Sequence, residues 1–163
     1  MINKINFLFV TLFGIGKIKK IPGSFASLAT ILFLFYLFNI LDIPPNIILI
    51  LIIIIFFISL YAVNIFIKNL TNKDPKEVVI DEFIGQSIPI CLYEVAHSPK
   101  ENEQSFKFYL IMFVLFRVFD IVKPFPVSYY EKKFKNSFGV IMDDVCAGLY
   151  VVAVLVLYMV INS

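Results

Sequence analysis

The apolar run from Asn46 to Leu70 constrains this chain most, because it is long enough to cross the hydrocarbon core of a bilayer as a single helix. Two prolines lie before it and a polar turn follows it, so both of its ends are defined. A helix that is apolar on all sides must be buried in a large core or in lipid. With 60% of its 163 residues hydrophobic and 16% charged, the chain is too apolar for an ordinary soluble domain. We therefore predict a membrane protein.

Four further segments have the character of membrane-embedded helices: Phe25 to Leu41, Asp81 to Ala96, Phe106 to Val122 and Asp143 to Ile161. The Asp81 segment is short and contains Gly85 and Pro89, so we expect it to be re-entrant, kinked or covered by protein. Residues 1–20 and 127–138 mix charges with apolar side chains and are expected to lie at the membrane interface. The predicted fold is all-α: a polytopic membrane helical bundle with four to five membrane-embedded helices, in one domain over residues 1–163.

The positive charges indicate which side of the membrane each loop occupies. Lysine and arginine gather before the first predicted span, between the second and third, and between the fourth and fifth. Because loops rich in lysine and arginine stay in the cytoplasm, five crossings would place the N-terminus there. We expect an integral protein of the inner membrane whose polar motifs lie on the cytoplasmic face.

Acidic residues recur at the ends of the predicted membrane helices, and all of them fall on this face. They are Asp81-Glu82, Asp120 and Asp143-Asp144. Carboxylates at the margin of a bilayer are costly unless they are paired or hold a cation. One acid at a helix start is commonly a cap, but two adjacent acids at each of two helix starts exceed what capping needs. Because helical neighbours point about 100° apart, one of each pair can bond locally while the other faces the bundle.

Two cationic side chains flank the middle acid. Arg117 and Lys123 each lie three residues from Asp120, on a helix that Pro124 ends. They could form a local ion pair and an interfacial lysine, or they could bind a phosphate, to which arginine donates paired hydrogen bonds. Acidic clusters together with two fixed cations suit a metal-assisted phosphate chemistry.

A glycine turn precedes the first predicted span. In Pro22-Gly23-Ser24, Ser24 could be the N-cap of the helix, or Gly23 and Ser24 could form an anion site at the helix start. His97 lies in a polar loop, which leaves no histidine for a histidine-based lipid phosphatase mechanism. Cys91 and Cys146 fall in apolar segments and are interpreted as reduced packing residues. No basic block is present, so nucleic acid is not an expected partner.

Taken in order, four stretches resemble the motifs of the phosphatidylglycerophosphatase A family. They are Gly14-Ile15-Gly16 followed by Ile21-Pro22-Gly23-Ser24-Phe25-Ala26-Ser27, then Val79 to Gly85, Phe116 to Pro126, and Gly139 to Gly148 with its Asp-Asp-x-x-Ala-Gly pattern. Ser24 and Ala26 replace a threonine and a glycine of the family pattern, and Asn136-Ser137 replaces a pair of glycines. These departures concern loop geometry, whereas every charged residue expected of the site is present.

The resemblance implies a Mg²⁺-dependent membrane enzyme that dephosphorylates phosphatidylglycerophosphate to phosphatidylglycerol in phospholipid biosynthesis. The expected partners are this lipid and the bilayer, and the oligomeric state is left open. We expect the catalytic residues to be Asp81, Glu82, Asp120, Asp143 and Asp144, of which Asp81, Glu82, Asp143 and Asp144 would hold one or two Mg²⁺ ions. The substrate phosphate would be bound by Gly23, Ser24, Arg117 and Lys123. The attacking group is either water or an aspartate.

Two other functions are weighed against this one. A CDP-alcohol phosphotransferase also uses Mg²⁺ and aspartates at helix ends, but its Asp-Gly…Ala-Arg…Gly…Asp…Asp run is not in this sequence. A small cation carrier or assembly subunit would have acidic residues deep within its spans, whereas here the acids cluster on one face.

Overall fold

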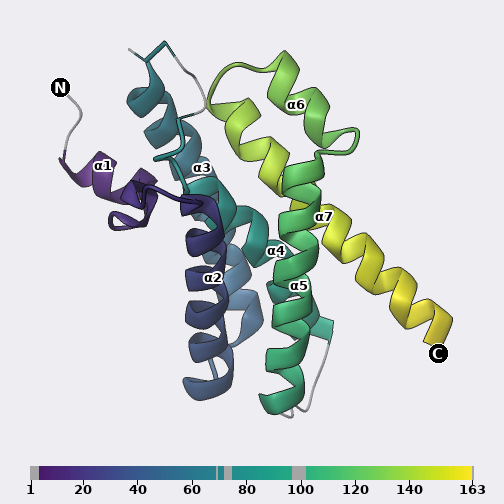
Figure 1. Ribbon diagram of the computed structural model, residues 1–163. Helices are drawn as coiled ribbons and strands as arrows, with labels where there is room; N and C mark the ends of the chain where they lie inside the picture. The colour runs from purple at the N-terminus through teal and green to yellow at the C-terminus, as the bar shows by residue number, and fades with distance from the viewer. Residues whose placement is uncertain (1–3, 69, 72–74, 97–101, 163) are drawn as a thin grey trace.

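The computed structural model describes residues 4–68, 70–71, 75–96 and 102–162, and this part of the chain contains helices and no strand (Figure 1). The elements are α1 (Lys4–Val10), the 3-10 turn η1 (Ile15–Lys17), α2 (Pro22–Phe35) with its π-helical continuation η2 (Tyr36–Ile40), α3 (Pro45–Ile67), α4 (Ile80–Ala96), α5 (Asn102–Val122), α6 (Val127–Lys133) and α7 (Ser137–Asn162). The all-α prediction is confirmed.

Among the described residues, three helices are long and apolar enough to cross a membrane: Pro22–Ile40, Pro45–Ile67 and Ser137–Ile161. They correspond to the first, second and fifth predicted spans. Pro22 and Pro45 stand at the starts of α2 and α3, where the missing N–H of proline costs no hydrogen bond. The predicted count of four to five membrane-embedded helices is not confirmed, since α4 has 17 residues and α5 begins with a polar sequence.

The α4 helix occupies the middle of the bundle and is covered by protein. It packs against α2, α3, α5 and α7, and Ile84, Ile90 and Cys91 on it are buried. Pro89 lies inside the helix without ending it. Of the three alternatives for this segment, coverage by protein is the one that the structure shows, which explains how a helix with polar residues can lie among apolar ones.

The helices alternate in direction, so the same kind of terminus recurs at one end of the bundle. At the upper end in Figure 1, α2, α4 and α7 begin while α3 and α5 end. The short helices α1 and α6 lie toward this end as well. The polar motifs therefore meet at one end of the bundle, as the sequence predicts.

The last helix begins earlier than predicted. The sequence suggests that the fifth span opens at Asp143, but α7 begins at Ser137. The side-chain oxygen of Asn136 accepts a hydrogen bond from the Gly139 N–H at 3.1 Å, which is the bond of an N-cap residue. Asp143 and Asp144 therefore lie inside α7, so the prediction that this helix begins at Asp143 is wrong and neither acid is its N-cap.

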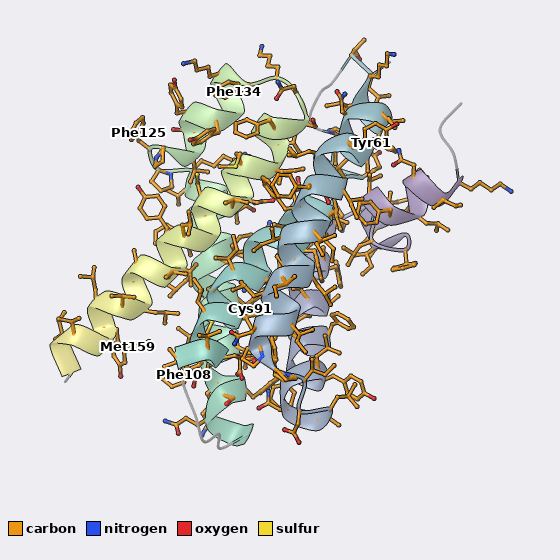
Figure 2. The ribbon with its side chains drawn as sticks, turned by 180° about the vertical axis from the view of Figure 1, so that it is seen from behind. Tyr61, Cys91, Phe108, Phe125, Phe134 and Met159 are labelled. Carbon is orange, nitrogen blue, oxygen red and sulfur yellow. The ribbon has the colours of Figure 1, made fainter. Side chains whose placement is uncertain are left out.

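The α6 helix is also shorter than the predicted amphipathic segment 127–138, because it ends at Lys133 and Ser137 already belongs to α7. An aromatic cluster joins the two helices: the Phe134 ring stacks on Tyr130 with centroids 5.9 Å apart and meets Phe138 edge-on at 5.5 Å. Figure 2 shows Phe125 and Phe134 at the same end of the bundle. Tyrosine side chains such as that of Tyr130 favour a membrane–water interface.

Glycines allow α4 and α7 to touch where they cross. A Cβ added to Gly148 would lie 2.3 Å from the carbonyl oxygen of Gly85, and one added to Gly85 would lie 2.5 Å from the carbonyl oxygen of Asp144. No larger residue fits between these backbones. This contact sets the distance between the two helices that carry paired acids.

Candidate active site

A cavity of about 450 Å³ lies at the end of the bundle where the polar motifs meet. It is lined by every residue that the sequence analysis assigns to the site: Gly23, Ser24, Asp81, Glu82, Arg117, Asp120, Lys123, Asp143 and Asp144. These residues come from α2, α4, α7, the last turns of α5 and the residue that follows α5. Side chains separated by more than a hundred residues in the sequence therefore share one space.

Three carboxylates form the centre of the cavity. Asp81, Glu82 and Asp144 each offer an oxygen atom, and these atoms lie within 4.8 Å of one another. Asp81 and Asp144 are 6% and 4% exposed, which places the cluster below the surface. Asp81 and Asp144 each precede a glycine of the α4–α7 crossing by four residues, so the crossing aims both side chains at the same point.

The two acidic pairs share a local hydrogen-bond pattern. The Asp81 carboxylate accepts the N–H of Glu82 at 3.1 Å, and the Asp143 carboxylate accepts the N–H of Asp144 at 3.0 Å. In each pair the first acid is thus bonded locally, as expected from their spacing. The second acid of each pair has a buried oxygen atom, Glu82 Oε2 or Asp144 Oδ1, without a hydrogen-bond partner in the described part of the chain.

The cationic side chains are held by acids of the same cavity. Arg117 Nη1 lies 2.9 Å from Asp120 Oδ2 and 4.0 Å from Glu82 Oε1, so it joins α5 to α4. Lys123 Nζ donates a hydrogen bond to Asp143 Oδ2 at 2.9 Å. Asp143 is therefore engaged by a lysine and stands outside the three-carboxylate cluster, although the sequence groups it with the metal ligands.

The carboxylate cluster suits a hard divalent cation. Oxygen atoms of carboxylates are the ligands that Mg²⁺ takes in proteins, usually one or two at a time with waters and phosphate oxygens beside them. Buried carboxylate oxygens that have no donor nearby are unfavourable unless a cation joins them. The unpartnered oxygens of Glu82 and Asp144 therefore fit a metal site made by Asp81, Glu82 and Asp144.

The start of α2 closes another side of the cavity. A Cβ added to Gly23 would lie 2.0 Å from Glu82 Oε1 and 3.2 Å from Arg117 Nη1, so the bare backbone of Gly23 gives room to both side chains. Ser24 is not the N-cap, because the helix begins at Pro22 after Ile21. The N–H groups of Ser24 and Phe25 already donate to the Ile21 carbonyl, at 3.1 and 3.3 Å, which leaves fewer free donors for an anion than the sequence suggests.

Two cationic residues of the cavity are not predicted as site residues from the sequence. Lys19 and Lys76 line the same cavity, and both are exposed. In the sequence they read as ordinary loop lysines, because each lies in a short connection with no periodic pattern. The only signal is their place beside motifs: Lys19 lies three residues before Pro22, and Lys76 lies five residues before Asp81.

Neither cysteine lines this cavity. Cys91 and Cys146 are free and buried, as predicted for reduced packing residues, and Figure 2 shows Cys91 among the helices. His97 lies outside the described residues. The polar cavity thus contains the residues predicted for catalysis and binding but neither cysteine.

Comparisons with known proteins show which family the chain is similar to. A profile of the family described as Phosphatidylglycerophosphatase A matches residues 8–159. The chain is 34% identical to phosphatidylglycerophosphatase A of Haemophilus influenzae over 154 residues, covering 94% of this chain and 88% of that protein. It is 28% identical to phosphatidylglycerophosphatase A of Escherichia coli over 137 residues, covering 84% and 73% of the two chains. A Bacteroides thetaiotaomicron protein provisionally named a phosphatidylinositol-3-phosphatase is 38% identical over 94 residues, covering 58% and 54%. No solved structure matches the chain.

Proposed function

Because the chain belongs to the phosphatidylglycerophosphatase A family, and is therefore a phosphatase, we propose that it hydrolyses phosphatidylglycerophosphate to phosphatidylglycerol and phosphate in phospholipid biosynthesis. The observation that carries the proposal is the single cavity in which three clustered carboxylates face Arg117 and Lys123. Anion-binding side chains beside a cation site are what the transfer of a phosphoryl group to water requires.

The proposed cofactor is Mg²⁺, held by Asp81, Glu82 and Asp144. When bound, this ion would act as a Lewis acid on a phosphoryl oxygen and offset the charge that develops there. Asp143 lies next to Asp144, but its carboxylate is held by Lys123, so we assign Asp143 to positioning that lysine. This assignment reduces the four expected ligands to three.

Arg117 and Lys123 are proposed to bind the phosphomonoester. Both already lie in the cavity with their charged ends against carboxylates, at 2.9 Å in each case. A fixed cation stabilises equatorial oxygens of a phosphoryl group best when it does not have to reorganise during the reaction. Asp120 and Asp143 supply that fixation, so we propose that these two acids act by orienting the arginine and the lysine.

A second cavity supports a lipid substrate. It measures about 490 Å³, and apart from Thr30 its lining is apolar: Phe9, Leu12, Phe13, Ile15, Ala29, Phe33, Ile55, Ile80 and Phe83. Ile80 and Phe83 flank Asp81 and Glu82 in the sequence, so the apolar cavity adjoins the first turn of α4 that carries the acids. An acyl chain could lie here while its headgroup enters the polar cavity. We propose that the site lies on the cytoplasmic face of the inner membrane, as the lysine and arginine distribution predicts.

The test is phosphate release from phosphatidylglycerophosphate by the purified protein in neutral detergent, with Mg²⁺ and then with EDTA. We expect release with Mg²⁺ and its loss with EDTA, restored by added Mg²⁺. Release that persists in EDTA would overturn the metal assignment. No release from folded protein in Mg²⁺ would overturn the substrate, and phosphatidylinositol 3-phosphate would then be assayed in its place.

The cation-carrier alternative has one feature in its favour, a buried acid far from the cavity. Glu94 near the end of α4 is 3% exposed. Its carboxylate accepts a hydrogen bond from the Tyr109 hydroxyl at 2.7 Å, which accounts for its burial by a local partner. Cation flux into liposomes without phosphatase activity would favour the carrier. Release of CMP from a CDP-lipid would favour the phosphotransferase.

A further inference from the structure

Two lysines at the mouth of the polar cavity have no role in the chemistry proposed above. Lys19 follows η1 and Lys76 precedes α4, and both side chains line the cavity while remaining exposed. The segment with Lys19 precedes α2, whereas the segment with Lys76 follows α3. Their convergence on one cavity is a property of the fold.

Close backbone contacts hold these two segments together. A Cβ added to Gly16 would lie 2.0 Å from the carbonyl oxygen of Glu77, so only glycine fits against the residue that follows Lys76. A few residues away, the Val79 N–H donates to the Val10 carbonyl at 3.0 Å. These contacts fix the backbone beside both lysines, which lie three residues after Gly16 and one residue before Glu77.

Among the described residues, no acid forms an ion pair with either of the two lysines. Arg117 and Lys123 are paired with Asp120 and Asp143 inside the cavity. Within the described part of the chain, neither Lys19 nor Lys76 has an ion-pair partner. The mouth of the cavity therefore carries two positive charges without an ion-pair partner in the described part of the chain, while each positive charge deeper inside is held in place by an acid.

We propose that Lys19 and Lys76 form a second anion subsite, which binds the phosphodiester of the substrate while its terminal phosphate lies deeper, at Arg117 and Lys123. The inference rests on the proposed function and extends it to headgroup selectivity. Phosphatidylglycerophosphate has a phosphodiester one glycerol unit away from its phosphomonoester, whereas inorganic phosphate and phosphatidic acid have no phosphodiester. A site with two anion-binding regions selects lipids that have both groups.

The experiment compares the wild type with the double variant Lys19→Gln/Lys76→Gln in neutral-detergent micelles. For phosphatidylglycerophosphate we expect KM to rise by about tenfold, since two exposed charge contacts each contribute a modest factor, with kcat changed less than twofold. The inhibition constant of inorganic phosphate, which probes the inner region alone, should stay within twofold. Lys19→Arg/Lys76→Arg should restore KM. The matched control is Lys20→Gln, because Lys20 is exposed beside Lys19 but does not line the cavity.

Each other outcome contradicts the subsite. An unchanged KM would show that the lysines do not contact the substrate. If the inhibition constant of inorganic phosphate rose as much as the KM of the lipid, the lysines would act on the inner region. If Lys20→Gln raised KM as much as the double variant, the lysines would act by a general attraction to anionic micelles. If the wild type itself releases no phosphate from this lipid, the proposed function fails, and the subsite fails with it.

Discussion

Gly148 lies against the backbone of Gly85, so that a Cβ on the former would be 2.3 Å from the carbonyl oxygen of the latter. Four residues before each glycine stands an aspartate, Asp144 on α7 and Asp81 on α4. Residues four apart lie on the same face of a helix. The contact between two glycines therefore determines how closely two carboxylates of the cluster approach each other one turn away.

Gly148→Ala should separate the helices and disperse the carboxylate cluster. The added methyl group meets backbone, which cannot rotate away, so we expect a loss of about 1–3 kcal/mol in unfolding free energy and loss of most phosphatase activity. Thermal unfolding in detergent and phosphate release measure the two effects. Leu149→Ala, at a position 50% exposed on the same helix, is the control. Normal Mg²⁺ activation in Gly148→Ala would contradict the link between crossing and site.

Gly23→Ala should damage the site with little damage to the fold. The new methyl group would lie 2.0 Å from Glu82 Oε1, which is the end of a flexible side chain and can move. We expect kcat to fall by about a hundredfold, the size of effect that misplacement of a catalytic group produces, while the unfolding temperature stays near that of the wild type. An unchanged kcat would show that the position of the Glu82 carboxylate does not matter for turnover.

Asp144→Asn and Asp143→Asn should differ in how they affect the metal. Asp144 belongs to the carboxylate cluster, so its loss should lower kcat by about a thousandfold and weaken Mg²⁺ binding. Asp143 holds Lys123, so its loss should raise KM for the lipid and change Mg²⁺ activation less. Titration of activity with Mg²⁺ for both variants is the measurement, with Asp42→Asn as the control at an exposed acid outside the cavity. Equal Mg²⁺ dependence in the two variants would place both acids at the metal.

Ala29→Phe should fill the apolar cavity beside the acids, because Ala29 lines it on α2. We expect KM for a long-chain phosphatidylglycerophosphate to rise severalfold, with a smaller change for a substrate with short acyl chains. Leu28→Phe is the matched control, since Leu28 is exposed on the same helix and does not line this cavity. An equal change in KM for both chain lengths would argue against an acyl chain in this cavity.

The sequence predicts the helical class of the fold and the acidic residues that share the polar cavity, because both depend on local patterns. Apolar runs mark three of the helices. Acidic side chains next to such runs are costly in a bilayer, which indicates that they share a functional site. The start of α7 is predicted wrongly for a local reason as well. Asn136 caps the helix seven residues before Asp143, and a polar cap followed by mixed residues has the sequence pattern of a loop.

What the sequence does not provide is the choice of partner for each charge. Asp143 and Asp144 are adjacent and identical in type, yet one binds Lys123 and the other joins Asp81 and Glu82. That division depends on the rotation of α7 against α4 and on the end of α5, which are tertiary features. Lys19 and Lys76 are missed for the same reason, since the contact of Gly16 with Glu77 connects segments about sixty residues apart.

The polar cavity has five carboxylates and four cationic side chains on its walls, so its formal charge is negative before any ligand enters. Under the proposed function, a phosphorylated lipid alone would meet repulsion from these carboxylates, and a metal ion alone would lack the phosphate oxygens that complete its coordination. Each ligand would then raise the affinity for the other, and thermodynamic linkage makes the two enhancements equal. A cavity with this charge balance would respond to the joint presence of two ligands: it would remain largely empty when either is scarce and fill steeply when both are present.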